Sequence, residues 1–377
     1  MQHLLNDILG DFVLYCSDKY KDIEKKVLSG ERLSKEDGLR LFACTDIAWL
    51  GSLADTVRKR KCGDQVYYNV NCHVNLTNIC ISHCKFCAFG RDKEDRGAYA
   101  MSLEAALETV RKAMQDPNLA GLHVVSGLHP DWSFEDYLSR LAALHEAFPS
   151  LYLKGFTGVE ITHFAKISGL PLKEVLLKLQ KAGLQAIAGG GAEILSDRVR
   201  RELCPNKATA EEWLEAARTA HSIGLKSNAS MLYGHIETME ERVDHLLTLR
   251  ALQDETGGLQ TFICFPFLPH NTELGKTVKQ TSIWDDLRTM AVSRLMLDNI
   301  RNIKAYWVML TVPVAQLALG FGANDIDGTI HKERILHDAG AASPTSLSED
   351  AIIRIIREAG RIPVACDCNF NILREIV

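Results

Sequence analysis

Short β-branched or apolar runs alternate with longer amphipathic stretches from Val66 onward. Repeated βα units produce this alternation, and such units build a parallel sheet covered by helices. The expected strands lie at residues 67–76, 121–127, 151–157, 184–190, 225–234, 261–267 and 305–311. This order predicts an α/β protein in which the strands close into a TIM-like (β/α) barrel, with an eighth strand at either 317–324 or 362–370.

The first 65 residues show a different pattern, with apolar residues three and four positions apart, as in amphipathic helices. Ser34 is a plausible N-cap because Lys35, Glu36 and Asp37 follow it. We therefore expect residues 1–65 to form an N-terminal helical extension, and residues 66–377 to form the barrel with a C-terminal closing segment. Within the barrel, the expected helices cover residues 101–115, 134–148, 173–182, 211–223, 239–255 and 284–300.

Composition narrows the class of protein. The net charge of −5 provides no global basic field, so binding to nucleic acid through overall phosphate attraction is not expected. No run approaches the roughly 20 apolar residues of a membrane span, and the opening residues lack a basic leader. An odd number of cysteines, eleven, is typical of reduced thiols. We expect a soluble cytoplasmic protein, in which clustered cysteines serve as metal ligands or catalytic groups.

Three cysteines cluster directly after the first expected strand, in Cys80-Ile-Ser-His-Cys84-Lys-Phe-Cys87. Thiolates this close in sequence converge when a metal centre holds them. A zinc site needs four ligands, and the nearest candidates for the fourth are His73 and His83. A cubane iron–sulfur cluster bound by three cysteines instead leaves one iron open to an external chelator. The alternative without metal is three thiols packed as small hydrophobic side chains.

The spacing CxxxCxxC, with the aromatic Phe86 before the last cysteine, resembles the signature of the radical S-adenosylmethionine (radical SAM) superfamily. That resemblance implies a [4Fe-4S] cluster on Cys80, Cys84 and Cys87, whose open iron binds S-adenosylmethionine. It also implies a barrel of the radical SAM type. In such barrels the reactive groups lie at the carboxyl ends of the strands.

Further motifs resemble the menaquinone and deazaflavin branch of that superfamily, over about residue 66 to the C-terminus. Within the branch, two segments are most similar to the aminofutalosine synthases. The motifs begin at His73, Cys87, Gly127, Gly189, Cys204, Met231, Leu252, Pro266 and Gly322. This similarity implies that a 5′-deoxyadenosyl radical adds to 3-[(1-carboxyvinyl)oxy]benzoate. Rearrangement and loss of bicarbonate then give 6-amino-6-deoxyfutalosine, an intermediate of menaquinone biosynthesis.

The resemblance also implies a set of cofactor-binding residues. The backbone near Phe86 should contact the adenine, Gly127 should let the chain approach the methionine part, and Glu193 should accept hydrogen bonds from the ribose. Met231 to Glu237 is similar to a loop that contacts the adenine. For both glutamates the alternative is an acid that merely favours a helix N-terminus.

Four residues are candidates for contact with the substrate. The substrate carries two carboxylates, so it needs local cations, and Arg91 after the cysteine loop is the first candidate. His129, Glu160 and Asn271 follow expected strands and could position the substrate or move protons. For Arg91 the alternative is a residue that merely caps a surface loop, and for the other three it is a structural polar group near the barrel rim. A small one-electron donor protein, a flavodoxin or a ferredoxin, is the expected partner.

Other functions remain open at this point. A dehypoxanthine futalosine cyclase or an F0 synthase-type enzyme of the same branch would abstract hydrogen from its substrate instead of adding to it. A zinc-stabilised scaffold is the alternative that is not an enzyme. Near the C-terminus, we expect Gly322 to Gly328 to form a turn that closes the mouth, and Cys366-Asp-Cys368 to be part of a buried strand.

Overall fold

The computed structural model describes residues 18–330 and 335–376. Its strands form a single curled sheet in which all neighbouring pairs are parallel except β10 with β11. The strand order is β11-β10-β1-β9-β8-β7-β6-β5-β4-β3-β2. The strands are β1 (Gln65–Asn69), β2 (Asn71–Asn75), β3 (Gly121–Val125), β4 (Tyr152–Thr157), β5 (Ala186–Ala188), β6 (Lys226–Tyr233), β7 (Leu259–Pro266), β8 (Asn302–Lys304), β9 (Asp325–Gly328), β10 (Ile362–Cys366) and β11 (Ile372–Glu375).

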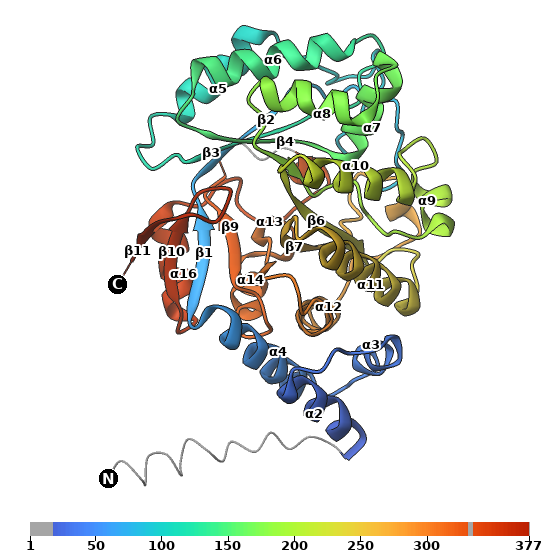
Figure 1. Ribbon diagram of the computed structural model, residues 1–377, viewed down its shortest axis with the longest axis vertical. Coiled ribbons are helices and arrows are strands. Elements are labelled where there is room, and N and C mark those ends of the chain that lie inside the picture. Colours follow the sequence, from blue (N-terminus) through green and yellow to red (C-terminus); the bar gives the residue numbers. More distant parts are fainter. Residues whose placement is uncertain (1–17, 331–334, 377) are drawn as a thin grey trace.

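Residues 65–75 are one continuous run of chain that forms two strands of the sheet, which lie far apart in the strand order. Its first half, β1, pairs with β9 and β10, whereas its second half, β2, pairs with β3. Only Val70 separates the two halves, so the sheet must curl until its two sides meet on this run. The expected α/β barrel is therefore confirmed, and Figure 1 shows β1 and β2 in blue where the sheet comes round.

Helices cover the outside of the sheet (Figure 1). The six expected helices are confirmed, but α7, α9, α14, α15 and α16 were not foreseen. The helices from β2 to β7 are α5 (Leu103–Ala113), α6 (Phe134–Ala147), α7 (Gly158–Ser168), α8 (Leu172–Lys181), α9 (Asp197–Leu203), α10 (Ala210–Ser222) and α11 (Met239–Thr256). Those after β7 are η2 (Leu274–Lys276), α12 (Ile283–Met296), α13 (Trp307–Leu310), α14 (Val312–Ala318), α15 (Ile335–Asp338) and α16 (Glu349–Glu358).

The expected strand at 305–311 is wrong, because residues Trp307–Leu310 form the short helix α13 and the strand β8 ends before it. All four residues of α13 are buried, and the Trp307 indole donates a hydrogen bond to the carbonyl of Gly328. A short, wholly apolar run shows no periodicity that separates a buried strand from a buried helix.

The C-terminal part of the sheet also differs from expectation. Residues 317–324 form no strand, and the strand β9 begins directly after them. The segment from Gly322 to Gly328 is thus mainly β9 and not only a turn. The other candidate, 362–370, contains β10, which ends at Cys366; Cys366 and Cys368 are both buried.

Helices η1 (Asp18–Tyr20), α2 (Lys21–Ser29), α3 (Lys35–Phe42) and α4 (Ile47–Cys62) precede the sheet. Ser34 caps α3 as expected, in a reciprocal capping box with Asp37. Helix α4 packs against α12, and α3 packs against α11. The described part of the N-terminal extension is therefore helical, and the domain boundary at residues 65 and 66 stays a prediction.

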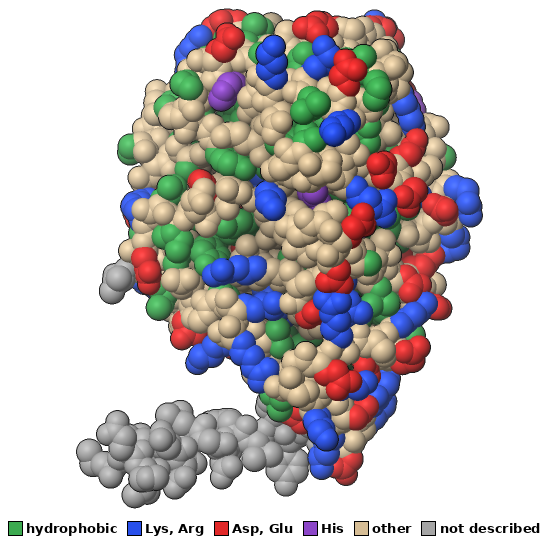
Figure 2. Space-filling view, in the orientation of Figure 1, with side chains coloured by type: hydrophobic (Ala, Val, Ile, Leu, Met, Phe, Trp, Pro, Cys, Tyr) green, Lys and Arg blue, Asp and Glu red, His purple; other side chains and the backbone are tan. Residues whose placement is uncertain are grey.

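Acidic and basic side chains are interspersed on the face shown in Figure 2, in keeping with the small net charge. Within residues 18–330 and 335–376, no helix combines the length and the apolar character needed to cross a membrane.

Candidate active site

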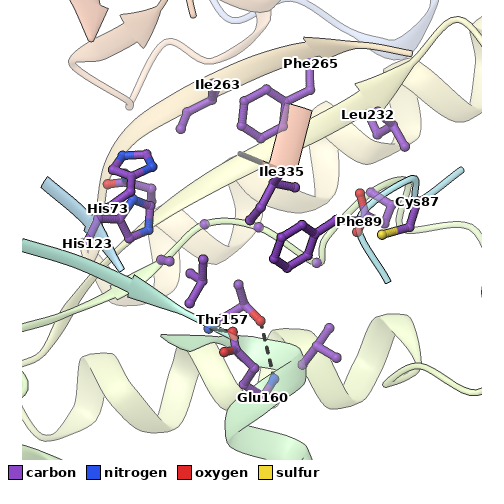
Figure 3. Close-up of a pocket in the computed structure, with 18 of the residues that line it drawn as sticks. His73, Cys87, Phe89, His123, Thr157, Glu160, Leu232, Ile263, Phe265 and Ile335 are labelled. Atoms are coloured by element: carbon purple, nitrogen blue, oxygen red, sulfur yellow. Dashed lines mark hydrogen bonds between the residues drawn. The ribbon is translucent and has the colours of Figure 1, made fainter. Parts of the chain in front are cut away.

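A cavity of about 370 Å³ lies inside the curled sheet and opens at the carboxyl ends of its strands. Its walls come from the loops after β2, β3 and β5 and from inward side chains of β4, β6, β7 and β8. Figure 3 shows the imidazoles of His73 and His123 at one end of the cavity and Cys87 at the other. Apolar side chains, among them Leu232, Ile263 and Phe265, line the wall between these ends.

The loop that carries the three cysteines is fixed on both sides by main-chain hydrogen bonds. Ile81 donates to the carbonyl of Leu128 after β3, and Lys85 donates to the carbonyl of Leu203 at the end of α9. Cys80 donates to the carbonyl of Arg91, which closes the loop on itself. Backbone bonds of this kind hold the loop independently of a ligand, so the thiols are preorganised.

Cys80, Cys84 and Cys87 all line the cavity and are partly exposed to it. The main-chain N–H of Gly90 donates to Cys87 Sγ at 3.3 Å. Burial raises the pKa of the Cys87 thiol, and a hydrogen bond with Cys204 together with burial raises that of Cys84. A positively charged iron centre would offset this shift, because thiolates are the ligand form. The three thiols and the N–H donor thus fit an iron–sulfur cluster.

The described residues contain no three His, Cys, Asp or Glu side chains that converge as ligands of one metal ion do. In a cubane each thiol binds its own iron, so the three need not share one centre. His83, a candidate for a fourth zinc ligand, has a side chain that is 53% exposed and faces Asp92 outside the cavity.

Gly127 lies against the cysteine loop. A Cβ at this position would lie 2.4 Å from the carbonyl oxygen of Ile79 and 3.2 Å from Cys80 Cβ. The Gly127 N–H donates to the carbonyl of Thr77, which holds the strand end at this distance. A side chain is therefore excluded by the backbone of the loop itself.

Phe86 and Glu193 also line the cavity, and Lys207 connects them. Lys207 Nζ donates to Glu193 Oε1 at 2.6 Å and lies 5.1 Å from the centre of the Phe86 ring. Glu193 has a left-handed backbone conformation, with φ of 46°, and is separated by Ala192 from the three glycines that follow β5. The pair holds one carboxylate at the cysteine end of the cavity.

Glu160 is buried at the start of α7 and lines the cavity. Its carboxylate accepts hydrogen bonds from the main-chain N–H groups of Ser126 and Thr157, each at 2.7 Å. Burial raises the pKa of Glu160 to about 7, against the opposing effect of these donors. A carboxyl group with this pKa can take up or release a proton near neutral pH.

Five predicted site residues lie outside the cavity lining. The Arg91 guanidinium donates to the carbonyls of Ala88 and Gly90, so it braces the cysteine loop. His129 is buried, stacks on Trp132 and accepts the N–H of Asp131. Asn271 is exposed and donates to the carbonyl of Asp338.

Met231 is fully buried in β6. The side chain of Glu237 is buried as well, and its carboxylate accepts hydrogen bonds from the N–H groups of Gly234 and His235 and from the guanidinium of Arg242. Although burial opposes them, His235 and Arg242 lower the pKa of Glu237 to about 2. These contacts match the structural alternatives, and a functional role for the five residues stays a prediction.

Sequence reasoning missed the polar end of the cavity. Lys154 from β4, Lys304 from β8 and Asp327 from β9 line it, together with His73 and His123. The available signal was a lysine in the otherwise apolar strand Tyr-Leu-Lys-Gly-Phe-Thr. A charged residue at the centre of a buried strand is rare and calls for a partner.

Comparison with known proteins agrees with this site. The model of the radical SAM superfamily matches residues 74–249, and the model of the CofH/MqnC C-terminal region matches residues 256–376. The chain belongs to the radical SAM superfamily. It is therefore an enzyme of the class that uses a [4Fe-4S] cluster and S-adenosylmethionine, as the cysteine triplet predicts.

Relatives cover nearly the whole chain. The aminodeoxyfutalosine synthase of Thermus thermophilus is 47% identical over 93% of this chain and 95% of its own length. The enzyme of that name from Streptomyces coelicolor is 43% identical, with 94% of each chain covered. A 5-amino-6-(D-ribitylamino)uracil–L-tyrosine 4-hydroxyphenyl transferase of Archaeoglobus fulgidus is 39% identical over 85% of this chain and 92% of its own.

Solved structures show the same fold at lower identity. Methylornithine synthase superimposes with a TM-score of 0.73 at 19% identity, covering 90% of this chain and 96% of the other. The FeFe-hydrogenase maturase HydG of Carboxydothermus hydrogenoformans gives a TM-score of 0.74 at 17% identity, covering 94% and 81%. The expected barrel of the radical SAM type is confirmed.

Proposed function

We propose that this chain is an aminodeoxyfutalosine synthase, which adds the adenosyl group of S-adenosylmethionine to 3-[(1-carboxyvinyl)oxy]benzoate in menaquinone biosynthesis. The observation that carries the proposal is one cavity with three cysteine thiols at one end and cationic side chains at the other. The synthases of two bacteria, 47% and 43% identical over nearly the whole chain, support it.

Cys80, Cys84 and Cys87 hold the cluster in this proposal, while the backbone near Phe86, Gly127 and Glu193 hold S-adenosylmethionine. When bound, this pair supplies a 5′-deoxyadenosyl radical. Apolar side chains such as Ile263 and Phe265 exclude water from the middle of the cavity, where a primary radical needs dry surroundings. The same walls restrict the substrate to a position near its target.

Glu160 is the one predicted substrate-contacting residue that lines this cavity. We assign it to holding a proton at its carboxyl group, because burial places its pKa at about 7. The neighbouring Ser126 and Thr157 N–H groups fix the orientation of that carboxyl. A cytoplasmic flavodoxin or ferredoxin is proposed as the one-electron donor.

The test is a product assay with the anaerobically reconstituted chain, a reductant, S-adenosylmethionine and the enol-ether benzoate. The expected main adenosyl product is 6-amino-6-deoxyfutalosine, identified by its mass. Free 5′-deoxyadenosine as the main product would instead indicate a hydrogen-abstracting enzyme of the same branch, chiefly the cyclase. Zinc at full occupancy without sulfide would contradict the proposal.

A further inference from the structure

We infer that Lys154 binds the ring carboxylate of the aromatic substrate. This inference rests on the proposed function and extends it to a second site in the same cavity. Lys154 lies in the middle of β4, lines the cavity and is only 7% exposed. Its Nζ donates to Asn228 Oδ1 at 3.3 Å and to the carbonyl of Cys368 at 3.0 Å.

Among residues 18–330 and 335–376, three lysines line the cavity, and their partners differ. Lys207 is paired with Glu193, and Lys304 is paired with Asp327 and lies 3.4 Å from Asp325. Lys154 has only neutral acceptors among residues 18–330 and 335–376, and no carboxylate there lies within salt-bridge distance. A buried cation without a counter-ion is costly, so an anionic ligand at this position would stabilise it.

The strand register places Lys154 in a polar layer of the barrel. His73 of β2 pairs in register with His123 of β3, and His123 pairs with Lys154 of β4. Their side chains therefore project to the same side at the same height. The next position along the layer is Ala186 of β5, a small buried residue that pairs in register with Lys154. Figure 3 shows the two imidazoles of this layer side by side.

The depth of this layer in the cavity indicates which of the substrate's two carboxylates reaches Lys154. Lys154 precedes Thr157, the last residue of β4, by three positions, which corresponds to roughly 10 Å along a strand. The enol-ether carbon must meet the adenosyl group near the cysteine loop at the mouth. Ile263, Phe265 and Lys154 all line the cavity. In the inferred pose the ring extends inward past the first two, and its carboxylate reaches the layer of Lys154.

The experiment combines variants with a ligand change. Binding of the enol-ether benzoate and of its ring carboxamide, which lacks that charge, is measured by calorimetry in the reconstituted full chain. Wild type should bind the carboxylate at least about 30-fold more tightly than the carboxamide, as for a truncated buried charge pair. Lys154→Met should bind both ligands equally, and Lys154→Arg should retain a preference for the carboxylate. Lys226→Met, at an exposed strand lysine, is the control and should behave as wild type.

Equal binding of the two ligands by wild type would overturn the inference, even if the methionine variant does not fold. An unchanged carboxylate preference in Lys154→Met would overturn it as well. The proposed function is scored separately by the product assay. If wild type forms no adenosyl adduct while the Lys154-dependent preference remains, the anion site stands and the proposed reaction fails.

Discussion

Gly127→Ala tests how closely the end of β3 controls the cysteine loop. The added Cβ would lie 2.4 Å from the carbonyl oxygen of Ile79, about 1 Å short of ordinary contact at 3.4 Å. The obstacle is main chain, which cannot rotate away, and Cys80 is the next residue. Overpacking of this kind lowers the free energy of unfolding by about 1–3 kcal/mol. A ligand displaced by about 1 Å can lower a rate by about 100-fold.

The control is Gly90→Ala in the same loop, where a Cβ would lie 3.7 Å from Cys87 Sγ, an ordinary contact. Both variants are reconstituted anaerobically, and iron and sulfide per chain are measured before S-adenosylmethionine is added. Because iron is measured before S-adenosylmethionine is present, a low iron content indicates a damaged cluster site and not impaired binding of S-adenosylmethionine. We expect Gly127→Ala to lose most of its iron and Gly90→Ala to retain it. Iron content and turnover within twofold of wild type in Gly127→Ala would refute the steric argument.

Three further predictions concern single side chains. Cys84→Ser should lose iron, whereas Cys204→Ser should keep it, because Cys204 lies beside Cys84 but outside the CxxxCxxC triplet; metal analysis decides this. Lys207→Met should lower the urea midpoint by the equivalent of about 3 kcal/mol, since it leaves the mostly buried carboxylate of Glu193 without its cation, and adding Glu193→Gln should restore much of this loss. Burial lowers the pKa of His221 from 6.5 to about 4, so this residue should contribute a loss of roughly 3 kcal/mol of stability between pH 6.5 and pH 4, where the unfolded chain takes up the proton first. Burial also lowers the pKa of His245, so His221→Gln should reduce the loss of wild type by that amount without abolishing it, and an equal loss in both proteins would contradict the assignment.

The cysteine loop and the barrel were predictable from the sequence because their signals are local. The CxxxCxxC spacing lies within eight residues, and each βα unit repeats a pattern of apolar residues. The residues 305–311 show where this reasoning fails, since a buried apolar run of that length fits a strand or a helix equally. The substrate-contacting roles predicted for His129 and Asn271 gained no support for a related reason, because neither side chain lines the cavity. Their position after a strand was visible, but the direction of their side chains was not.

The polar end of the cavity depends on contacts between distant parts of the chain. Lys154 meets Asn228, 74 residues later, and the carbonyl of Cys368, 214 residues later. The layer it shares with His73 and His123 is set by strand register, which the sequence does not specify position by position. A lysine in an apolar strand indicates that the lysine has a polar partner, but it does not identify that partner. The fold provides neutral acceptors for this lysine and a carboxylate for each of the other two, and this difference is what identifies Lys154 as the site for an anionic ligand.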